Sequence, residues 1–132
     1  MGTAVWMRSL RSLLPLRLRA RVARPSEIRM GSPQYGPLVL DGEVVVDSSA
    51  IDARSLLWAP DGRLLAAQEL VSWSDGPVTR AVVSDAGRRA RIAASAPEKG
   101  LANPVSFEGE GLIYRHWNEH SGEQQMRLEI NT

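Results

Sequence analysis

The stretch Trp58-Ala59-Pro60-Asp61-Gly62-Arg63-Leu64-Leu65-Ala66 decides the fold class of this chain of 132 residues. Pro60 restricts φ at the first corner of a turn, and Asp61 can bond to its own turn backbone. Gly62 accepts the left-handed conformation that lets a strand reverse. Apolar residues flank the turn on both sides, so the segment predicts a β-hairpin.

Turn signals of the same kind recur along the chain, at Asp41-Gly42, Asp75-Gly76, Ala86-Gly87 and Gly109-Glu110-Gly111. Short apolar or alternating runs lie between them: Glu27 to Met30, Leu38 to Leu40, Glu43 to Val46, Leu56 to Ala59, Leu64 to Glu69, Thr79 to Val83, Ala90 to Ala94, Leu112 to Trp117 and Gln125 to Ile130. This spacing predicts an all-β fold, an antiparallel meander or sandwich of about seven to nine short strands.

A weak internal repeat supports the same architecture. The glycines of four apolar-acid-glycine segments, at 42, 62, 87 and 109, stand 20, 25 and 22 residues apart. A period of this length is typical of one β-hairpin per copy.

The Pro60-Asp61-Gly62 segment resembles the Ser-Pro-Asp-Gly hairpin of β-propeller repeats over about ten residues. A propeller needs at least four blades of four strands, and this chain offers strands for about two, so a closed propeller from one chain is excluded. The stretch from Met30-Gly31-Ser32-Pro33 through the hairpin is also similar to small uncharacterised bacterial β-proteins that carry one propeller-type Pro-Asp-Gly hairpin. This resemblance implies a structural element and no activity.

Charge divides the chain into two unlike parts. The formal net charge is +1, yet residues 1–30 hold seven arginines and one acid, Glu27, for a net of +6, and the rest carries −5. We therefore expect a basic N-terminal arm, residues 1–26, joined to a single β-rich domain, residues 27–132. The arm is predicted to be disordered or a short helix, although the alternation from Leu16 to Val22 also fits a strand.

Three roles for the arm stay open. Its arginines, serines and near absence of acids suit a mitochondrial transit peptide. The same arginines would suit a tether to nucleic acid or anionic lipid. The third reading is a non-functional extension upstream of a working start at Met7 or Met30.

Composition excludes several classes of protein. The chain has no cysteine, so disulfide scaffolds, thiolate metal sites and cysteine nucleophiles are ruled out. No uncharged apolar run approaches the roughly 20 residues that cross a bilayer, so no transmembrane segment is predicted. All but one of the 16 basic residues are arginine, which suggests a GC-rich coding sequence. We expect a bacterial, cytoplasmic protein.

The segment His116-Trp117-Asn118-Glu119-His120 matches the inverted zincin pattern His-x-x-Glu-His. On a helix, His116 and His120 would face one zinc ion while Glu119 activated a water molecule. Strand-like residues precede the segment and a Ser121-Gly122 turn signal follows it, which favours a polar hairpin loop over a helix. No cofactor is expected, and a zinc-dependent hydrolase at 116–120 is the alternative function.

A second cluster contains arginines and an aromatic residue: Arg80, Arg88, Arg89, Arg91 and Trp73. Such a set can form a nucleic-acid surface. The body is acidic, however, and Asp75 and Asp85 lie near these arginines in the sequence. Cross-strand ion pairs on a solvated face are therefore the favoured reading, and nucleic acid is not the expected partner.

The tryptophans of the body separate into packing and contact residues. Trp58 adjoins Leu56 and Leu57, which favours a role in the core. Trp117 is the better candidate for an exposed aromatic contact. Candidate partner-binding residues are Trp117, Trp73, Arg88 and Arg89.

No nucleophile elbow, phosphate-binding loop or dinucleotide fingerprint is present. The leading hypothesis is therefore a non-enzymatic β-domain that binds another protein, of an immunity or accessory type. The sequence leaves the oligomeric state and the strand order open.

Overall fold

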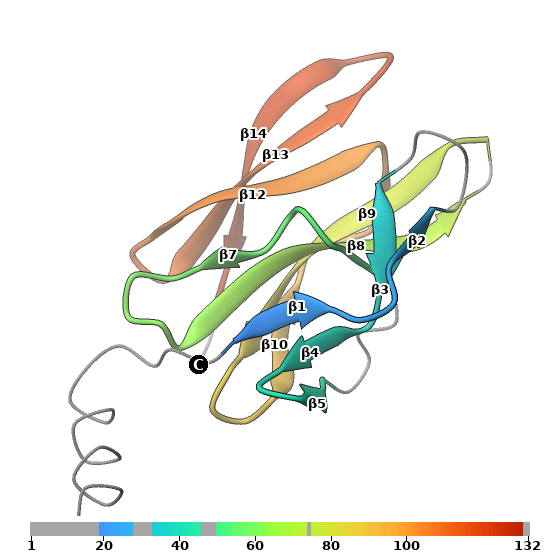
Figure 1. The fold of residues 1–132 in the computed structure, drawn as a ribbon. Coiled ribbons are helices and arrows are strands. Elements are labelled where there is room, and N and C mark those ends of the chain that lie inside the picture. The colour runs from blue at the N-terminus through green and yellow to red at the C-terminus, as the bar shows by residue number, and fades with distance from the viewer. Residues whose placement is uncertain (1–18, 28–32, 46–49, 74, 131–132) are drawn as a thin grey trace, which may run out of the picture.

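The computed structural model describes residues 19–27, 33–45, 50–73 and 75–130, and none of these residues is helical. Within these described residues, fourteen strands form three antiparallel sheets that lie in layers (Figure 1). The predicted all-β fold class is therefore confirmed, with more strands than expected. Several have only two or three residues, whereas the strands at 64–73, 77–85, 111–118 and 122–129 are longer than the expected runs.

Sheet A has the order β1-β4-β5 and consists of β1 (Ala20–Val22), β4 (Leu38–Leu40) and β5 (Glu43–Val44). Sheet B has the order β10-β9-β8-β6-β3-β2, with β11 on β9 and β7 on β8. Its strands are β2 (Ser26–Glu27), β3 (Gln34–Gly36), β6 (Ile51–Asp52), β7 (Leu57–Trp58), β8 (Leu64–Trp73), β9 (Pro77–Asp85), β10 (Ala90–Ala94) and β11 (Glu98–Lys99). Sheet C has the order β12-β13-β14 and consists of β12 (Leu101–Glu108), β13 (Gly111–Asn118) and β14 (Gly122–Glu129).

The β8–β9 hairpin is the middle layer, and both of its faces are buried. Residues 65–69 of β8 are buried in succession, without the alternation of a strand that has one wet face. Leu65 and Ala67 face the core shared with sheet A, and Ala66 faces the core shared with sheet C. The small alanine side chains let two further layers pack against this hairpin.

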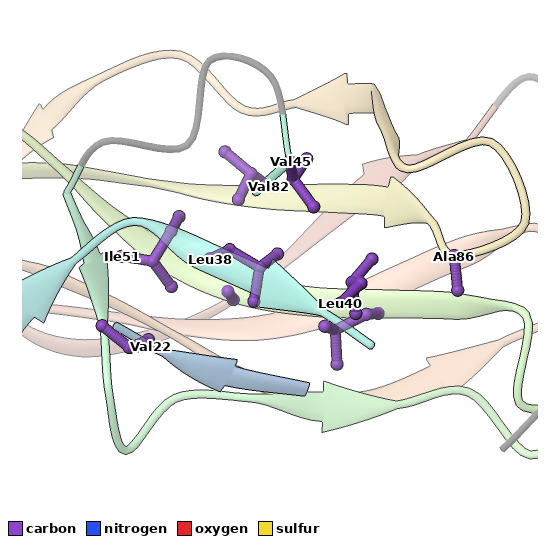
Figure 2. Close-up of a cluster of buried hydrophobic side chains, with 9 residues drawn as sticks. Val22, Leu38, Leu40, Val45, Ile51, Val82 and Ala86 are labelled. Carbon is purple, nitrogen blue, oxygen red and sulfur yellow. The ribbon is translucent and has the colours of Figure 1, made fainter. Parts of the chain in front are cut away.

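The first core joins sheet A and β6 to the β8–β9 hairpin (Figure 2). It contains Val22, Leu38, Leu40, Val45, Ile51, Leu65, Ala67, Val82 and Ala86, with Trp58 packed at its border. The second core joins sheet C to the opposite face and contains Ala66, Ala81, Val83, Ala102, Leu112, Tyr114 and Ile130. The predicted packing role of Trp58 is thus confirmed.

Buried polar side chains join sheet B to sheet C and join neighbouring strands within sheet B. Gln68 is fully buried and its amide nitrogen donates to Asp52 Oδ2 at 3.0 Å, while its amide oxygen accepts from Ala102 N at 2.6 Å. On the other face of β8, the buried Glu69 accepts from Arg80 Nε at 2.8 Å and pairs with Arg91. These bonds satisfy groups that would otherwise be costly to bury.

The predicted turns form as their residues require. Asp41 and Gly42, with φ of 52° and 90°, make the two-residue turn between β4 and β5. In the hairpin of β7 and β8, Gly62 N donates to Ala59 O at 2.9 Å, and Gly62 has a φ of 72°. The repeated glycines therefore each lie at a reversal between strands.

Most expected runs contain a strand, and those at 38–40 and 90–94 have the predicted bounds. The parts of the expected runs at 28–30 and at 46 lie outside the described residues. The sequence pattern did not predict β12, because Pro104 interrupts this strand. The structure tolerates this proline because β12 is an edge strand and its register shifts between Pro104 and Ser106.

The expected basic arm, residues 1–26, includes strand β1, so residues 20–22 are neither disordered nor helical but part of the fold, in agreement with the strand alternative for residues 16–22. β1 pairs in register with β4, and Val22 is buried among Leu38 and Ile51 (Figure 2). The alternating arginines favoured the interpretation of this segment as a basic arm. The apolar partners of Val22 are distant in the sequence, so the sequence pattern alone did not show that Val22 is buried. Residues 1–18 lie outside the described residues.

Substitution on the two faces of β1 tests this correction. Val22→Asp places a charge in the core, so we expect the melting temperature to fall by roughly 10 °C or more. Arg21→Asp changes the exposed neighbour of Val22 and should leave the melting temperature nearly unchanged. Equal effects of the two variants in thermal denaturation would contradict the placement of β1.

Tyr35 on β3 has a buried hydroxyl that finds no hydrogen-bond partner among the described residues. Burial, followed by the negative charge of Asp52, raises the pKa of Tyr35 to about 12, against a partial offset from Arg54. A raised tyrosine pKa means that the folded state resists ionisation. Its contribution to stability is complete below pH 10 and is lost as the pH rises towards 12.

Tyr35→Phe removes the unpartnered hydroxyl and should stabilise the domain by about 1 kcal/mol at neutral pH. The advantage of the variant should widen above pH 10, where the wild-type tyrosine ionises on unfolding. Urea denaturation of both proteins at pH 7 and pH 11 measures this. If the two proteins differed in free energy of unfolding by the same amount at pH 7 and at pH 11, the raised pKa of Tyr35 would be refuted.

Candidate functional site

A groove of about 420 Å³ opens at one end of the layered sheets. Three segments that are distant in the sequence meet there: the β8–β9 turn, the end of β11 and the β13–β14 loop. The lining residues are Asp75, Gly76, Pro77, Lys99, Gly100, Trp117, Asn118, Glu119, His120 and Ser121. We call this feature the end groove.

Local sequence shapes the two loops that border the end groove. Asp75 and Gly76 both have positive φ, 57° and 107°, and reverse the chain between β8 and β9. In the β13–β14 loop, Asn118 Oδ1 accepts from His120 N at 2.9 Å and from Ser121 N at 2.7 Å. This Asx-type arrangement holds the loop in a defined shape.

Gly100 fastens the loops to each other. Its φ is +107°, and a Cβ at this position would lie 1.9 Å from the carbonyl oxygen of Trp117. Gly100 N donates to Pro77 O at 2.8 Å, and Thr79 Oγ1 donates to Gly100 O at 2.8 Å. Only glycine lets the backbone approach this closely, so the groove is built on a fixed base.

Trp117 forms one wall of the end groove and is 47% exposed. The expectation that Trp117 is exposed is therefore confirmed, and its role in binding stays a prediction. The ionisable side chains around it, Asp75, Lys99, Glu119 and His120, are all exposed. Glu119 and His120 approach each other to 3.8 Å in solvent, where such a pair is screened.

The arrangement required by the zinc hypothesis is absent, because the segment forms a strand end and a loop instead of a helix. His116 lies within β13, is 5% exposed, and its Nε2 lies 2.8 Å from the carbonyl oxygen of Lys99. His120 projects into solvent from the loop, with a side chain that is 88% exposed. Among the described residues no group of three His, Asp or Glu side chains is arranged to hold a metal ion.

His116 instead anchors the base of the end groove. The bond to Lys99 joins β13 to β11, and Glu98 Oε2 lies 3.7 Å from the same ring nitrogen. Successive side chains of a strand point to opposite faces of the sheet, so His116 faces the interior and its neighbour Trp117 faces away from it.

The other predicted partner-binding residues, Trp73, Arg88 and Arg89, do not lie together in the structure. Trp73 pairs with the groove residue Pro77 across the β8–β9 turn and is half-buried. Arg88 and Arg89 lie beyond the opposite end of β9, where Arg88 Nε is 3.8 Å from Asp85 Oδ2. Arg89 Nε lies 3.3 Å from Glu43 Oε2.

The arginine patch near Trp73 is therefore not formed. Arg80 and Arg91 both bind Glu69, a cross-strand arrangement that agrees with the ion-pair reading. The pairs are more buried than a solvated face would make them, since the Glu69 side chain is only 7% exposed.

Sequence reasoning missed Asp75, Lys99 and Asn118 as groove residues. Each belongs to a different segment, and no spacing along the chain links them. A second hollow of about 360 Å³ lies between the β7–β8 and β12–β13 loops and was also missed. Its lining is Ala59, Pro60, Asp61, Leu64, Phe107, Gly109, Glu110 and Ile130.

Comparisons of the chain with protein-family models, with curated proteins and with solved structures gave no match. No helix in the described part of the chain has the length and apolar character needed to cross a membrane.

The two histidines provide a matched test of this geometry. His116→Leu removes the side chain that binds Lys99 O, so we expect a melting temperature lower by roughly 5 °C and faster amide exchange at Gly100. His120→Leu should change neither quantity, because its side chain is exposed. Comparable losses in both variants, or loss of a bound zinc ion in both, would contradict the separate roles assigned to them.

Proposed function

We propose that this domain binds another protein through the end groove, with Trp117 as the anchoring side chain. The observation that carries the proposal is a tryptophan that is 47% exposed in the wall of a hollow of about 420 Å³. Tryptophan is enriched among the residues that dominate binding energy in protein interfaces, because it buries a large rigid surface at low entropic cost.

The ionisable groups of the groove support recognition more than catalysis. Asp75, Lys99, Glu119 and His120 are exposed, so solvent keeps their charges screened. Catalytic acids and bases typically lie in partly buried clefts that shift their pKa values. Exposed charges around an aromatic anchor instead resemble the polar rim of an interface.

The groove is also preorganised for binding. Gly100, the Asn118 hydrogen bonds and the His116 bond to Lys99 fix its base and its loop. A surface that is already ordered loses little conformational entropy when a partner binds.

Charge favours a basic partner. Residues 98–130, which form β11 and sheet C, hold six glutamates against one lysine and two arginines. A negative surface attracts a positive one and steers the encounter. The partner would therefore present a basic surface to the groove.

The test is affinity capture on immobilised protein from an extract of the source cells. A partner held by the wild-type domain should be lost with Trp117→Ala and retained with Val44→Ala, a matched change of an apolar side chain that is 59% exposed on β5. The captured protein is then purified and titrated against each variant. We expect Trp117→Ala to weaken binding at least tenfold, about 1.4 kcal/mol.

Salt dependence checks the electrostatic part of the proposal. Binding of a basic partner should weaken as ionic strength rises, mainly through a slower association rate. A partner held equally by wild type and Trp117→Ala would refute the end groove as the binding site.

A further inference from the structure

The two edges of sheet C differ in their capacity to accept another strand. β12 carries Pro104, which has no N–H to donate, and its register with β13 shifts after that residue. β14 pairs with β13 over eight residues, Gly122 to Glu129, without a shift and without proline. Bulges and prolines protect edge strands from further pairing, so β14 is the open edge.

The backbone of β14 shows which residues face outward. Ile130 N donates to Glu110 O at 2.8 Å, so residue 130 is hydrogen-bonded across to β13. In an antiparallel pair this direction alternates, and the even-numbered residues of β14 bond to β13. Glu123, Gln125 and Arg127 therefore point their N–H and C=O groups away from the sheet. Within the part of the chain that the structure describes, β14 pairs with β13 alone.

Among registers that overlap more than half of β14, side-chain charges favour one way of pairing the strand with itself. A two-fold axis at Gln125 sets Glu123 of each copy opposite Arg127 of the other, which gives two opposite-charge pairs. An axis at Met126 sets Glu123 opposite Glu129, and an axis at Arg127 sets two arginines opposite each other. The Gln125 register alone among these combines outward backbone groups with complementary charges.

We propose that two copies of this chain associate through β14, antiparallel and with Gln125 on the two-fold axis. The two copies of sheet C then form one continuous six-stranded sheet. Glu123 and Arg127 are accessible for this, with side chains that are 57% and 42% exposed. Glu123 now pairs with Arg115 at 3.9 Å, and Arg127 pairs with Glu129 and donates to Glu108 O at 3.0 Å. These bonds lie at the exposed surface, where ion pairs contribute little stability, and pairing across the axis would replace them.

This association is independent of the proposed partner site. Trp117 lies on β13, one strand inward from the pairing edge, and the pairing uses the outward backbone groups of β14. Trp117→Ala should therefore abolish capture of a partner protein and leave the dimer intact, so the two proposals fail separately.

Cysteine substitution tests the register directly, because the chain has no cysteine of its own. Gln125→Cys places two thiols across the axis with Cα atoms about 5.5 Å apart, within the range of a disulfide. We expect a covalent dimer under mild oxidation. Glu129→Cys is the matched control, since its two copies would stand about 27 Å apart at 3.4 Å per residue and should not link.

Charge-reversing substitutions test the two predicted pairs between Glu123 of one copy and Arg127 of the other. Glu123→Arg sets arginine opposite arginine twice and should shift the protein to monomer in sedimentation equilibrium. Adding Arg127→Glu restores opposite charges in the reverse order and should restore the dimer. A wild-type protein that stays monomeric at roughly 0.5 mM, or equal cross-linking of Gln125→Cys and Glu129→Cys, would overturn the proposal.

Discussion

Burial of the β8–β9 hairpin on both faces is the constraint on which the rest of the structure depends. The hairpin places Leu65 and Ala67 towards sheet A and Ala66 towards sheet C. Among the described residues, both hydrophobic clusters contain side chains of this hairpin, so each outer sheet obtains its core from it. Alanine at three central positions, 66, 67 and 81, keeps the middle layer thin. Larger side chains there would separate the layers and weaken both cores.

Double burial creates an electrostatic requirement that the polar side chains meet. Gln68 and Glu69 have no wet face to occupy, because each side of the hairpin is covered. Gln68 therefore bonds to Asp52 and Ala102, and Glu69 bonds to Arg80 and Arg91. Satisfied groups of this kind hold strands in one register, since a shifted strand would leave them unpaired in the interior.

The layered arrangement also explains where the candidate site lies. The β8–β9 turn extends past the second core to the level of the β13–β14 loop, and β11 connects them. The close approach of Gly100 to Trp117 and the bond of His116 to Lys99 hold these loops in place and so fix the shape of the end groove beside Trp117. The open edge of β14 lies on the same sheet but outside the hollow. One sheet thus offers a loop surface for a partner and an edge for a second copy.

The sequence by itself determined the turns and the fold class, because both depend on local chemistry. Positive φ at Gly42 and Gly62, and the short apolar runs between such turns, follow from neighbouring residues alone. It also indicated that Trp117 would be exposed. It could not show that Val22 belongs to the core, that His116 and His120 face different ways, or that Lys99, Asp75 and Trp117 share a groove. Those results depend on contacts between distant segments, which only the packing of three sheets brings together.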